Sequence, residues 1–157
     1  MTLRLQSASR TFTVEQANAT LPLVRAITKD LVDLSRQLAE RKLQLAELVD
    51  GRSLRPGDLY TDELLESKKD VEKELARVQG FADELLELGV EPKSALDGLI
   101  DFPSSLDGRP VFLCWKLGEP EVMYYHERGA GYAGRKPLPV TPDTSAVRKG
   151  ELEHSCL

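Results

Sequence analysis

The chain has 157 residues, of which 41% are hydrophobic and 30% are charged, and its formal net charge is −5 at pH 7. This length predicts one domain, which can bury enough surface to fold without a disulfide or metal staple. The acidic balance argues against binding to a nucleic-acid backbone, and no apolar run is long enough to span a bilayer. Because the chain has only two cysteines, Cys114 and Cys156, and no apolar signal segment at its N-terminus, we expect a cytoplasmic protein.

The composition changes along the chain and predicts four segments. Residues 1–11 have no clear pattern and are expected to be flexible, whereas residues 12–89 are charged and favour helices. Residues 90–138 are rich in glycine, proline and aromatic side chains, which is typical of short strands and turns. Residues 139–157 form a proline-containing tail without periodicity. We therefore expect an α+β fold, with a long antiparallel helical hairpin followed by a small antiparallel β-sheet that includes a glycine-rich loop.

A short capped helix is expected before the hairpin. Thr13 is a suitable N-cap, and Gln16 three residues later completes a capping box. This helix is expected to end near Thr20, because Pro22 disfavours helical geometry in the residue before it and suits the first turn of a new helix.

The hairpin itself is predicted from two apolar seams, whose members are spaced three and four residues apart. Thr61 or Asp62 is expected to cap the second helix, and Gly89 is a natural terminator. The seam residues are Val24, Ile27, Leu31, Leu34, Leu38, Leu45 and Leu48 in the first helix, and Leu64, Val71, Leu75, Val78, Ala82 and Leu85 in the second.

The length of the hairpin predicts a second copy of the chain as its partner. At about 1.5 Å per residue, the first helix of the hairpin is roughly 43 Å long. A small sheet cannot cover that length. Leu43, Leu65 and Leu86 lie off the main seams and form a second apolar stripe. We therefore expect a homodimer through a four-helix, coiled-coil-like arrangement. The alternative is a monomer in which the β-unit folds back along the hairpin.

Three strands are expected in the second half of the chain, at residues 98–102, 110–116 and 121–126. The turns between them are expected at residues 104–108 and 117–120.

The second turn decides whether a metal site can form. Its even length predicts that Cys114 and His126 point to opposite faces of the sheet, so the two could not share an ion with a carboxylate such as Glu119. A bulge or an odd-length turn would be needed to bring them together. No close pair of cysteines or histidines has the spacing of a zinc site inside the folded region, so we expect no metal ligands.

A glycine-rich segment at residues 129–134 matches the pattern G-x-G-x-x-G. The residues that follow it, starting with Arg135, Lys136 and Pro137, cannot form the helix that a dinucleotide fingerprint requires. Backbone amides beside Arg135 and Lys136 could instead bind a carboxylate or a phosphate. A tight loop that requires positive φ is the alternative interpretation.

Five motifs occur in order along the chain: FTVEQANATLP at 12–22, GLIDFP at 98–103, LCWKLGE at 113–119, YHE at 125–127 and GYAGR at 131–135. Together they resemble the bacterial domain-of-unknown-function family 2203, over residues 12–138. The resemblance implies a small stand-alone bacterial protein. It assigns no activity or substrate, and the cofactor stays unknown.

The first functional hypothesis is the binding of a small polar or anionic ligand where the sheet meets the helices. Aromatic and charged side chains crowd together there, as in a polar pocket with apolar walls. The expected lining residues are Trp115, Glu119, His126, Arg135 and Asn18. If the site is catalytic, the candidate acid–base groups are His126, Glu119 and Asp101, because a neutral imidazole beside a carboxylate can act as a general base.

The alternative hypothesis is a dimeric helical-hairpin scaffold without catalysis, in which the sheet merely ends the bundle. The sequence leaves open whether the protein is an enzyme. It also leaves open whether a small-molecule ligand or another protein is the partner.

Overall fold

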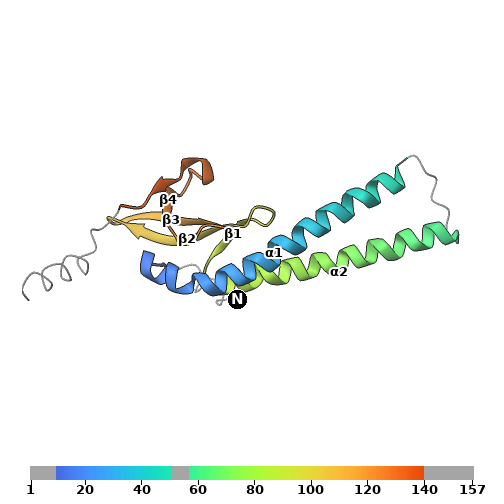
Figure 1. Cartoon of the computed structure of the whole chain (residues 1–157), viewed down its shortest axis with the longest axis horizontal. Helices are drawn as coiled ribbons and strands as arrows, with labels where there is room; N and C mark the ends of the chain where they lie inside the picture. Colours follow the sequence, from blue (N-terminus) through green and yellow to red (C-terminus); the bar gives the residue numbers. More distant parts are fainter. Residues whose placement is uncertain (1–9, 51–56, 140–157) are drawn as a thin grey trace, which may run out of the picture.

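The structure, a computed structural model, describes residues 10–50 and 57–139 (Figure 1). Two long helices, α1 (Val14–Val49) and α2 (Leu59–Glu87), form an antiparallel hairpin, and a five-stranded antiparallel sheet follows, so the fold is α+β as predicted. The strands are β1 (Glu91–Ser94), β2 (Leu99–Leu106), β3 (Arg109–Lys116), β4 (Tyr124–Glu127) and β5 (Lys136–Pro137), and a short 3-10 helix, η3 (Tyr132–Gly134), precedes β5.

The sheet lies beside one end of the hairpin, and the other end projects beyond it (Figure 1). No helix in the described ranges is both long and apolar enough to cross a bilayer. Of the two predicted terminal segments, only residues 10, 11 and 139 are among the described residues.

The helix α1 is continuous, so the predicted break at Pro22 is wrong. The predicted capping box is confirmed, because Thr13 Oγ1 accepts a hydrogen bond from Gln16 N and the Gln16 side chain accepts one from Thr13 N. A proline inside a helix costs about 3 kcal/mol, since the carbonyl four residues earlier loses its donor. Leu21 and Val24 are buried on either side of the proline, and this burial offsets the cost. The N-terminal, blue part of α1 bends away from the rest in Figure 1, as a proline kink does.

The helix α2 begins slightly earlier than predicted and ends as predicted. Its N-cap is Asp58, so Thr61 lies inside the first turn and is not the cap. At the other end, Gly89 has a φ of 92° and donates a hydrogen bond from its N–H to the Leu86 carbonyl, which terminates the helix.

The strands β2 and β3 are joined by a two-residue turn, Asp107 and Gly108, with φ values of 52° and 77°. Positive φ at both positions matches a type I′ turn, whose twist suits a hairpin. Because the turn is this tight, β2 runs on to Leu106, and residues 104–106, which the sequence predicts as part of a turn, are paired with β3.

The predicted facing of β3 and β4 is wrong. Cys114 pairs with Tyr124 and Phe112 pairs with His126, whereas an even-length turn would have placed Met123 opposite Cys114. The connection covers residues 117–123, which is an odd number. Cys114 and His126 therefore lie on the same face of the sheet.

Local hydrogen bonds explain this register. Glu119 folds back on the end of β3, where its Oε1 accepts a hydrogen bond from Lys116 N at 2.6 Å. The chain then turns towards α1, and Val122 N donates to Asn18 Oδ1 at 2.7 Å. Residues 120–123 are thus held by α1 and do not pair with β3, so pairing resumes only at Tyr124.

The hydrophobic core lies between one face of the sheet and the hairpin. Because successive side chains of a strand point to opposite faces, alternate residues of β2 and β3 supply this core. Its sheet residues are Ile100, Phe102, Leu113 and Trp115, which pack with Ala17, Leu21, Val24 and Leu31 of α1, Leu85 of α2, and Phe12, Val90 and Val122.

Candidate functional site

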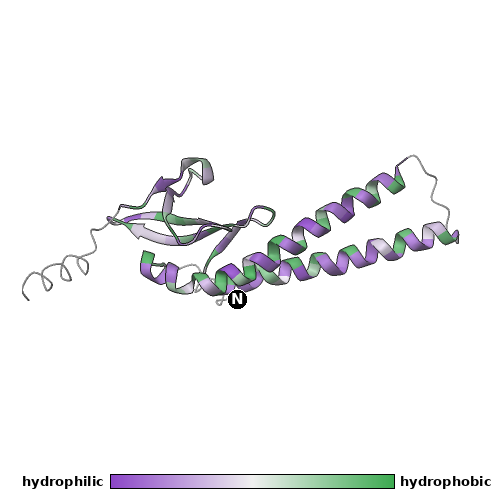
Figure 2. Cartoon of the chain, viewed as in Figure 1, coloured by the Kyte–Doolittle hydropathy of each residue, from purple (hydrophilic) through white to green (hydrophobic). Residues whose placement is uncertain are grey.

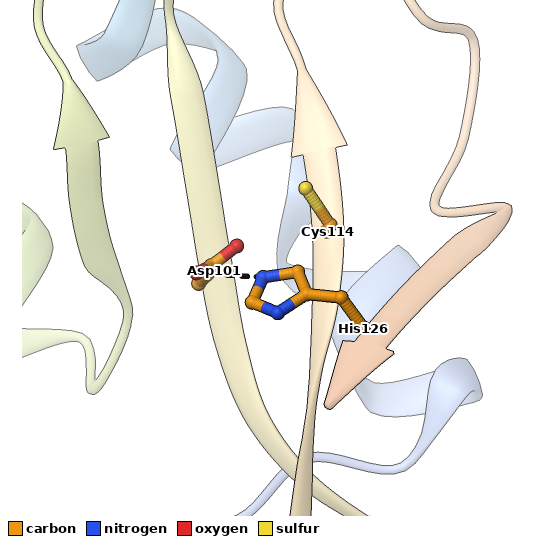
Figure 3. Close-up of side chains that lie close together, drawn as sticks. All are labelled: Asp101, Cys114 and His126. Carbon is orange, nitrogen blue, oxygen red and sulfur yellow. Dashed lines mark hydrogen bonds and ion pairs between the residues drawn. The ribbon is translucent and has the colours of Figure 1, made fainter. Parts of the chain in front are cut away.

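Three buried polar side chains meet on the face of the sheet that points away from this core. Asp101 comes from β2, Cys114 from β3 and His126 from β4, and Figure 3 shows Asp101 in contact with His126 and Cys114 close beside them. Their exposed fractions are 2%, 0% and 3%. One potential ligand atom from each lies within 4.8 Å of those of the other two. We call these three residues the outer-face cluster.

The local sequence explains how three strands bring polar groups together here. Asp101 stands between the core residues Ile100 and Phe102, so the alternation of the strand turns its carboxylate to the outer face. The same alternation applies to Cys114, which is the direct cross-strand partner of Asp101. His126 lies diagonally from this pair, because it is the cross-strand partner of Phe112, two residues along β3 from Cys114. Its ring packs beside Phe112 with 5.6 Å between the ring centroids.

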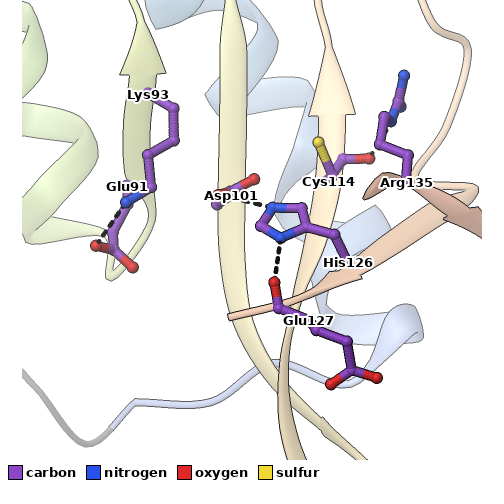
Figure 4. A network of polar contacts seen from close by, with 7 residues as sticks. All are labelled: Glu91, Lys93, Asp101, Cys114, His126, Glu127 and Arg135. Carbon is purple, nitrogen blue, oxygen red and sulfur yellow. Dashed lines mark hydrogen bonds and ion pairs between the residues drawn. The ribbon is translucent and has the colours of Figure 1, made fainter. Parts of the chain in front are cut away.

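Both ring nitrogens of His126 have a partner. Nδ1 lies 2.8 Å from the backbone carbonyl oxygen of Glu127, and Nε2 lies 3.0 Å from Oδ2 of Asp101 (Figure 4). Both partners are hydrogen-bond acceptors, so a neutral ring, which has a single N–H, can satisfy only one of them. When that N–H is on Nδ1 and donates to the carbonyl, Nε2 directs a lone pair at the carboxylate. The contact therefore requires a cation, whether a proton or a metal ion.

The rest of the cluster adds a further acceptor and a thiol. Oδ1 of Asp101 is buried and has no hydrogen-bond partner among the described residues. Burial, and after it the negative charge of Asp101, raises the pKa of the Cys114 thiol to about 12, although the Arg135 guanidinium acts in the opposite direction. A nucleophilic cysteine needs a lowered pKa and access to substrate. The cluster does not fit nucleophilic catalysis, but its N, O and S donors are those of a metal site.

Glu119 and Arg135, two of the predicted ligand-binding residues, form an ion pair beside the cluster. Arg135 Nη2 donates to Glu119 Oε1. It also donates to the Cys114 carbonyl oxygen, and Figure 4 draws both of these residues. The guanidinium also lies over the rings of Tyr124 and Tyr132, 4.1 and 4.8 Å from their centroids. Burial lowers the pKa of Arg135, but the hydrogen bond to Glu119 and its charge raise it overall. A carboxylate of the same chain thus neutralises this arginine.

Trp115 and Asn18, also predicted to line the site, lie on the helix-facing side of the sheet. Trp115 is fully buried in the core, and its indole N–H donates to the Glu119 carbonyl oxygen at 2.9 Å. Asn18 accepts the hydrogen bond from Val122 that holds the β3–β4 connection. The structure therefore brings His126 and Asp101 together and pairs Glu119 with Arg135, but the sheet separates Trp115 and Asn18 from His126.

A pocket of about 420 Å³ lies where the end of α2 meets the sheet. We call it the junction pocket. Its lining includes the side chains of Arg10, Leu86, Glu91, Phe112 and Arg128, together with Gly89. Phe112 contributes to both the junction pocket and the surroundings of His126.

No sequence signal indicated that Arg10 belongs to this pocket, because residues 1–11 have no pattern of their own. Its position follows from contacts far apart in the chain. Phe12 N donates to the Pro103 carbonyl at 2.7 Å, and Ser104 Oγ donates to the Phe12 carbonyl at 2.6 Å, which fixes the segment beside β2. Arg10 then packs over Gly89, where an added Cβ would lie 3.0 Å from Arg10 Cδ.

The glycine-rich segment forms a compact loop. Gly131 has a φ of 63°, and the N–H groups of Gly134 and Arg135 donate to the carbonyls of Gly131 and Tyr132. These two amides are used within the loop, so they are not available to hold a phosphate.

Residues 10–138 match the sequence model of a family described as "Uncharacterized conserved protein (DUF2203)". The chain belongs to this family. The match covers the hairpin and the whole sheet, so the outer-face cluster and the junction pocket both lie inside the DUF2203 region. Neither a curated protein nor a solved structure matches the chain significantly.

Proposed function

We propose that this DUF2203 protein binds a small anionic ligand in the junction pocket. The observation that carries the proposal is the presence of two arginines, Arg10 and Arg128, on the lining of one pocket. No carboxylate of residues 10–50 or 57–139 pairs with either guanidinium. In a chain with a net charge of −5, such a local excess of positive charge favours an anion at this position.

The other charged groups at the pocket leave this excess in place. Glu91 is the acidic residue of the lining, and its Oε1 lies 3.3 Å from Lys93 Nζ, so its charge is matched (Figure 4). The Phe112 ring has Lys93 Nζ 5.4 Å and the Arg128 guanidinium 5.4 Å from its centroid. These contacts hold two cations beside an aromatic surface.

The chemistry of the lining suggests the class of ligand. A guanidinium binds carboxylate and phosphate through paired N–H donors. Phe112 and Leu86 supply an apolar surface next to those donors. We infer that the ligand combines one carboxylate or phosphate group with an apolar or aromatic portion.

Phenyl phosphate is a suitable probe, followed by NMR titration of the full chain. Binding should saturate, should shift the backbone signals around Gly89 and Arg128, and should be tighter than that of inorganic phosphate. The double variant Arg10→Gln/Arg128→Gln should weaken binding by about tenfold or more, which corresponds to about 1.4 kcal/mol. Arg77→Gln, at an exposed arginine of α2, is the matched control and should leave binding unchanged. Equal affinity of the wild type and the double variant would exclude the proposal.

We also propose that the chain forms a homodimer through the part of the hairpin that lies beyond the sheet. Leu43 and Leu65 of the predicted second stripe have exposed fractions of 63% and 50%, whereas its third member, Leu86, lies at the sheet end of α2 and lines the junction pocket. The buried residues of α1 end at Leu38. Figure 2 shows apolar residues in green along the projecting ends of both helices. A second hairpin would cover these leucines.

Native mass spectrometry tests the dimer, and the variant Leu43→Glu/Leu65→Glu should convert it to a monomer, because each charge would be buried at the interface. Leu23→Glu is the control, since Leu23 is also exposed (52%) but lies in the part of α1 beside the sheet. A wild-type chain that is monomeric at all concentrations would refute this second proposal.

A further inference from the structure

We propose that the outer-face cluster is a binding site for a divalent transition-metal ion of the zinc class, with Asp101, Cys114 and His126 as its ligands. The junction pocket does not include any of these three side chains, so the proposal is independent of the anionic ligand.

The first argument is the convergence of lone pairs. Nε2 of His126 can accept, as can both carboxylate oxygens of Asp101, and within the described part of the chain Oδ1 faces no donor stronger than the Cys114 thiol. A buried polar atom without a partner costs about 1–3 kcal/mol. A metal ion would take one ligand atom each from Asp101, His126 and Cys114 and so turn these converging acceptors into ligands.

The second argument is the orientation of the histidine. Metal-binding histidines usually donate their other ring N–H to a carbonyl or a carboxylate, which fixes the ring and its tautomer. The contact from His126 Nδ1 to the Glu127 carbonyl has this form and leaves Nε2 as the ligand atom. In Figure 3, Nε2 is the ring nitrogen that faces Asp101, next to Cys114.

The third argument is distance. Around a tetrahedral zinc ion with bonds of about 2.0 Å to N and O and about 2.3 Å to S, neighbouring ligand atoms lie about 3.2–3.6 Å apart. His126 Nε2 and Asp101 Oδ2 are 3.0 Å apart, and no pair of ligand atoms in the cluster exceeds 4.8 Å. Side-chain movements of about 1 Å or less therefore suffice to close the cluster around an ion.

The fourth argument is charge. A buried cluster is stable only if its charges balance. A divalent ion with one carboxylate, one thiolate and one neutral imidazole has a total charge of zero. Without the ion, the same neutrality requires two protons, one on the thiol and one shared by Asp101 and His126. Binding thus exchanges one divalent ion for two protons and leaves no net charge in the interior.

The composition of the donor set indicates the ion. One sulfur, one nitrogen and one oxygen ligand suit a borderline metal such as Zn²⁺, whereas Ca²⁺ and Mg²⁺ prefer oxygen ligands alone. Three protein ligands leave one tetrahedral position, which a water molecule or another small ligand takes up.

The chain offers an unusually clean background for the test. It has only two histidines and two cysteines, and the other pair, His154 and Cys156, lies outside the described residues. In the variant His154→Ala/Cys156→Ala, any thiolate ligand must be Cys114 and any imidazole ligand must be His126. The protein is produced without a metal-affinity tag, freed of metal with a chelator and titrated with Co²⁺, which occupies zinc sites and absorbs visible light.

We expect one ion per chain by native mass spectrometry, a near-ultraviolet thiolate-to-cobalt band and the visible bands of tetrahedral Co²⁺, all displaced by Zn²⁺. Cys114→Ser in this background should remove the thiolate band and weaken binding by at least about 100-fold. Asp33→Asn, at an exposed carboxylate of α1, is the matched control and should change nothing.

A folded His154→Ala/Cys156→Ala protein that gives no thiolate-to-cobalt band overturns the proposal, and this result does not depend on whether any ligand variant folds. The Arg10→Gln/Arg128→Gln variant should bind Co²⁺ normally. Failure of the metal site and failure of the anion site can therefore be told apart.

Discussion

The two faces of the sheet bury side chains of opposite chemistry. On the face against the hairpin, Phe102 and Trp115 are fully buried among apolar side chains. On the other face, Asp101, Cys114 and His126 have exposed fractions of 3% or less. Burial of apolar surface stabilises a fold directly, at about 25 cal/mol per Å². Burial of polar groups costs free energy unless each finds a partner.

This difference separates the face that supplies the apolar core from the face on which we propose the metal site. On the helix-facing side, the indole N–H of Trp115 donates to the Glu119 carbonyl. The outer face leaves Asp101 Oδ1 without a partner in the described residues and places His126 Nε2 3.0 Å from Oδ2 of the same carboxylate. Sites that bind ions or substrates commonly carry this kind of local cost.

The largest loss of stability is expected for a substitution on the helix-facing side of the sheet. Phe102→Ala should lower the free energy of unfolding by about 3–5 kcal/mol, because it leaves a cavity in the core where Phe102 meets the edge of Phe12. Urea denaturation followed by the fluorescence of Trp115, the single tryptophan, measures this change.

Phe112→Ala is the control from the outer face of the same hairpin. Phe112 is only half-buried, so its loss should cost less than half as much. Equal losses for the two variants would show that both faces belong to one apolar core and would remove the contrast between them.

The second-largest effect on stability should come from metal binding, and it should depend on the outer face alone. Zinc at 100 times its dissociation constant should raise the free energy of unfolding by about 2.7 kcal/mol, because the ion binds only the folded cluster. A chelator should reverse the gain. In Phe102→Leu, which keeps the outer face intact, the gain should persist, and in Cys114→Ser it should vanish. Thermal unfolding with and without Zn²⁺ measures all three, and an equal gain in Cys114→Ser would locate the ion elsewhere.

The helices were predictable because their signals are local. The steps of three and four residues and the capping box of Thr13 and Gln16 require no knowledge of the rest of the chain. The proline break was a wrong prediction for the complementary reason. Local geometry disfavours Pro22 inside a helix, but Leu21 and Val24 are buried against a sheet that forms about 80 residues later in the chain, and a local rule does not include that burial.

The sequence identified individual residues of the candidate site, but it did not predict how they are arranged. Asp101 and His126 were singled out as candidate acid–base groups, because a neutral imidazole beside a carboxylate can act as a general base. Their meeting with Cys114 depends on the register of β3 and β4, which the hydrogen bond from Val122 to Asn18 shifts by one residue. These two residues are 104 positions apart in the sequence, so no pattern near the turn reveals the contact. A one-residue shift reverses every facing in the strand.

A third, smaller effect on stability is expected from the Cys114 thiol, and it concerns the outer face alone. In the chelator-treated protein, the Cys114 thiol keeps its proton up to a pKa of about 12, whereas the ordinary value of 9.0 applies to the unfolded chain. Above pH 9 the unfolded state therefore binds fewer protons, and stability falls as the pH rises. The slope for one proton is at most about 1.4 kcal/mol per pH unit.

This loss of stability at high pH should appear as a difference in the free energy of unfolding between two variants. With Cys156→Ala in both, the chain that keeps Cys114 should lose stability relative to Cys114→Ala between pH 8 and pH 10, because tyrosines and lysines contribute equally to the two. A constant difference over this range would mean that the thiol is not held protonated by its surroundings.

The smallest effect on stability is expected for Asp101→Asn, and it is the most informative. The amide keeps the shape of the carboxylate and adds N–H donors, so it can donate to Nε2 of His126 while Nδ1 still donates to the Glu127 carbonyl. The metal-free variant should therefore be as stable as the metal-free wild type within about 1 kcal/mol, since a hydrogen bond from the amide replaces the one made through the proton that Asp101 and His126 share. The same change removes an anionic ligand and should abolish the cobalt spectrum.

Asp101→Asn separates a structural role of the cluster from a ligand-binding one. If the Asp101–His126 contact existed to hold the sheet together as an ion pair, breaking it would destabilise the metal-free protein by several kcal/mol. Urea denaturation in the presence of chelator distinguishes the two outcomes. Unchanged stability together with lost metal binding would mean that the fold tolerates the acid at this buried position because an ion uses it.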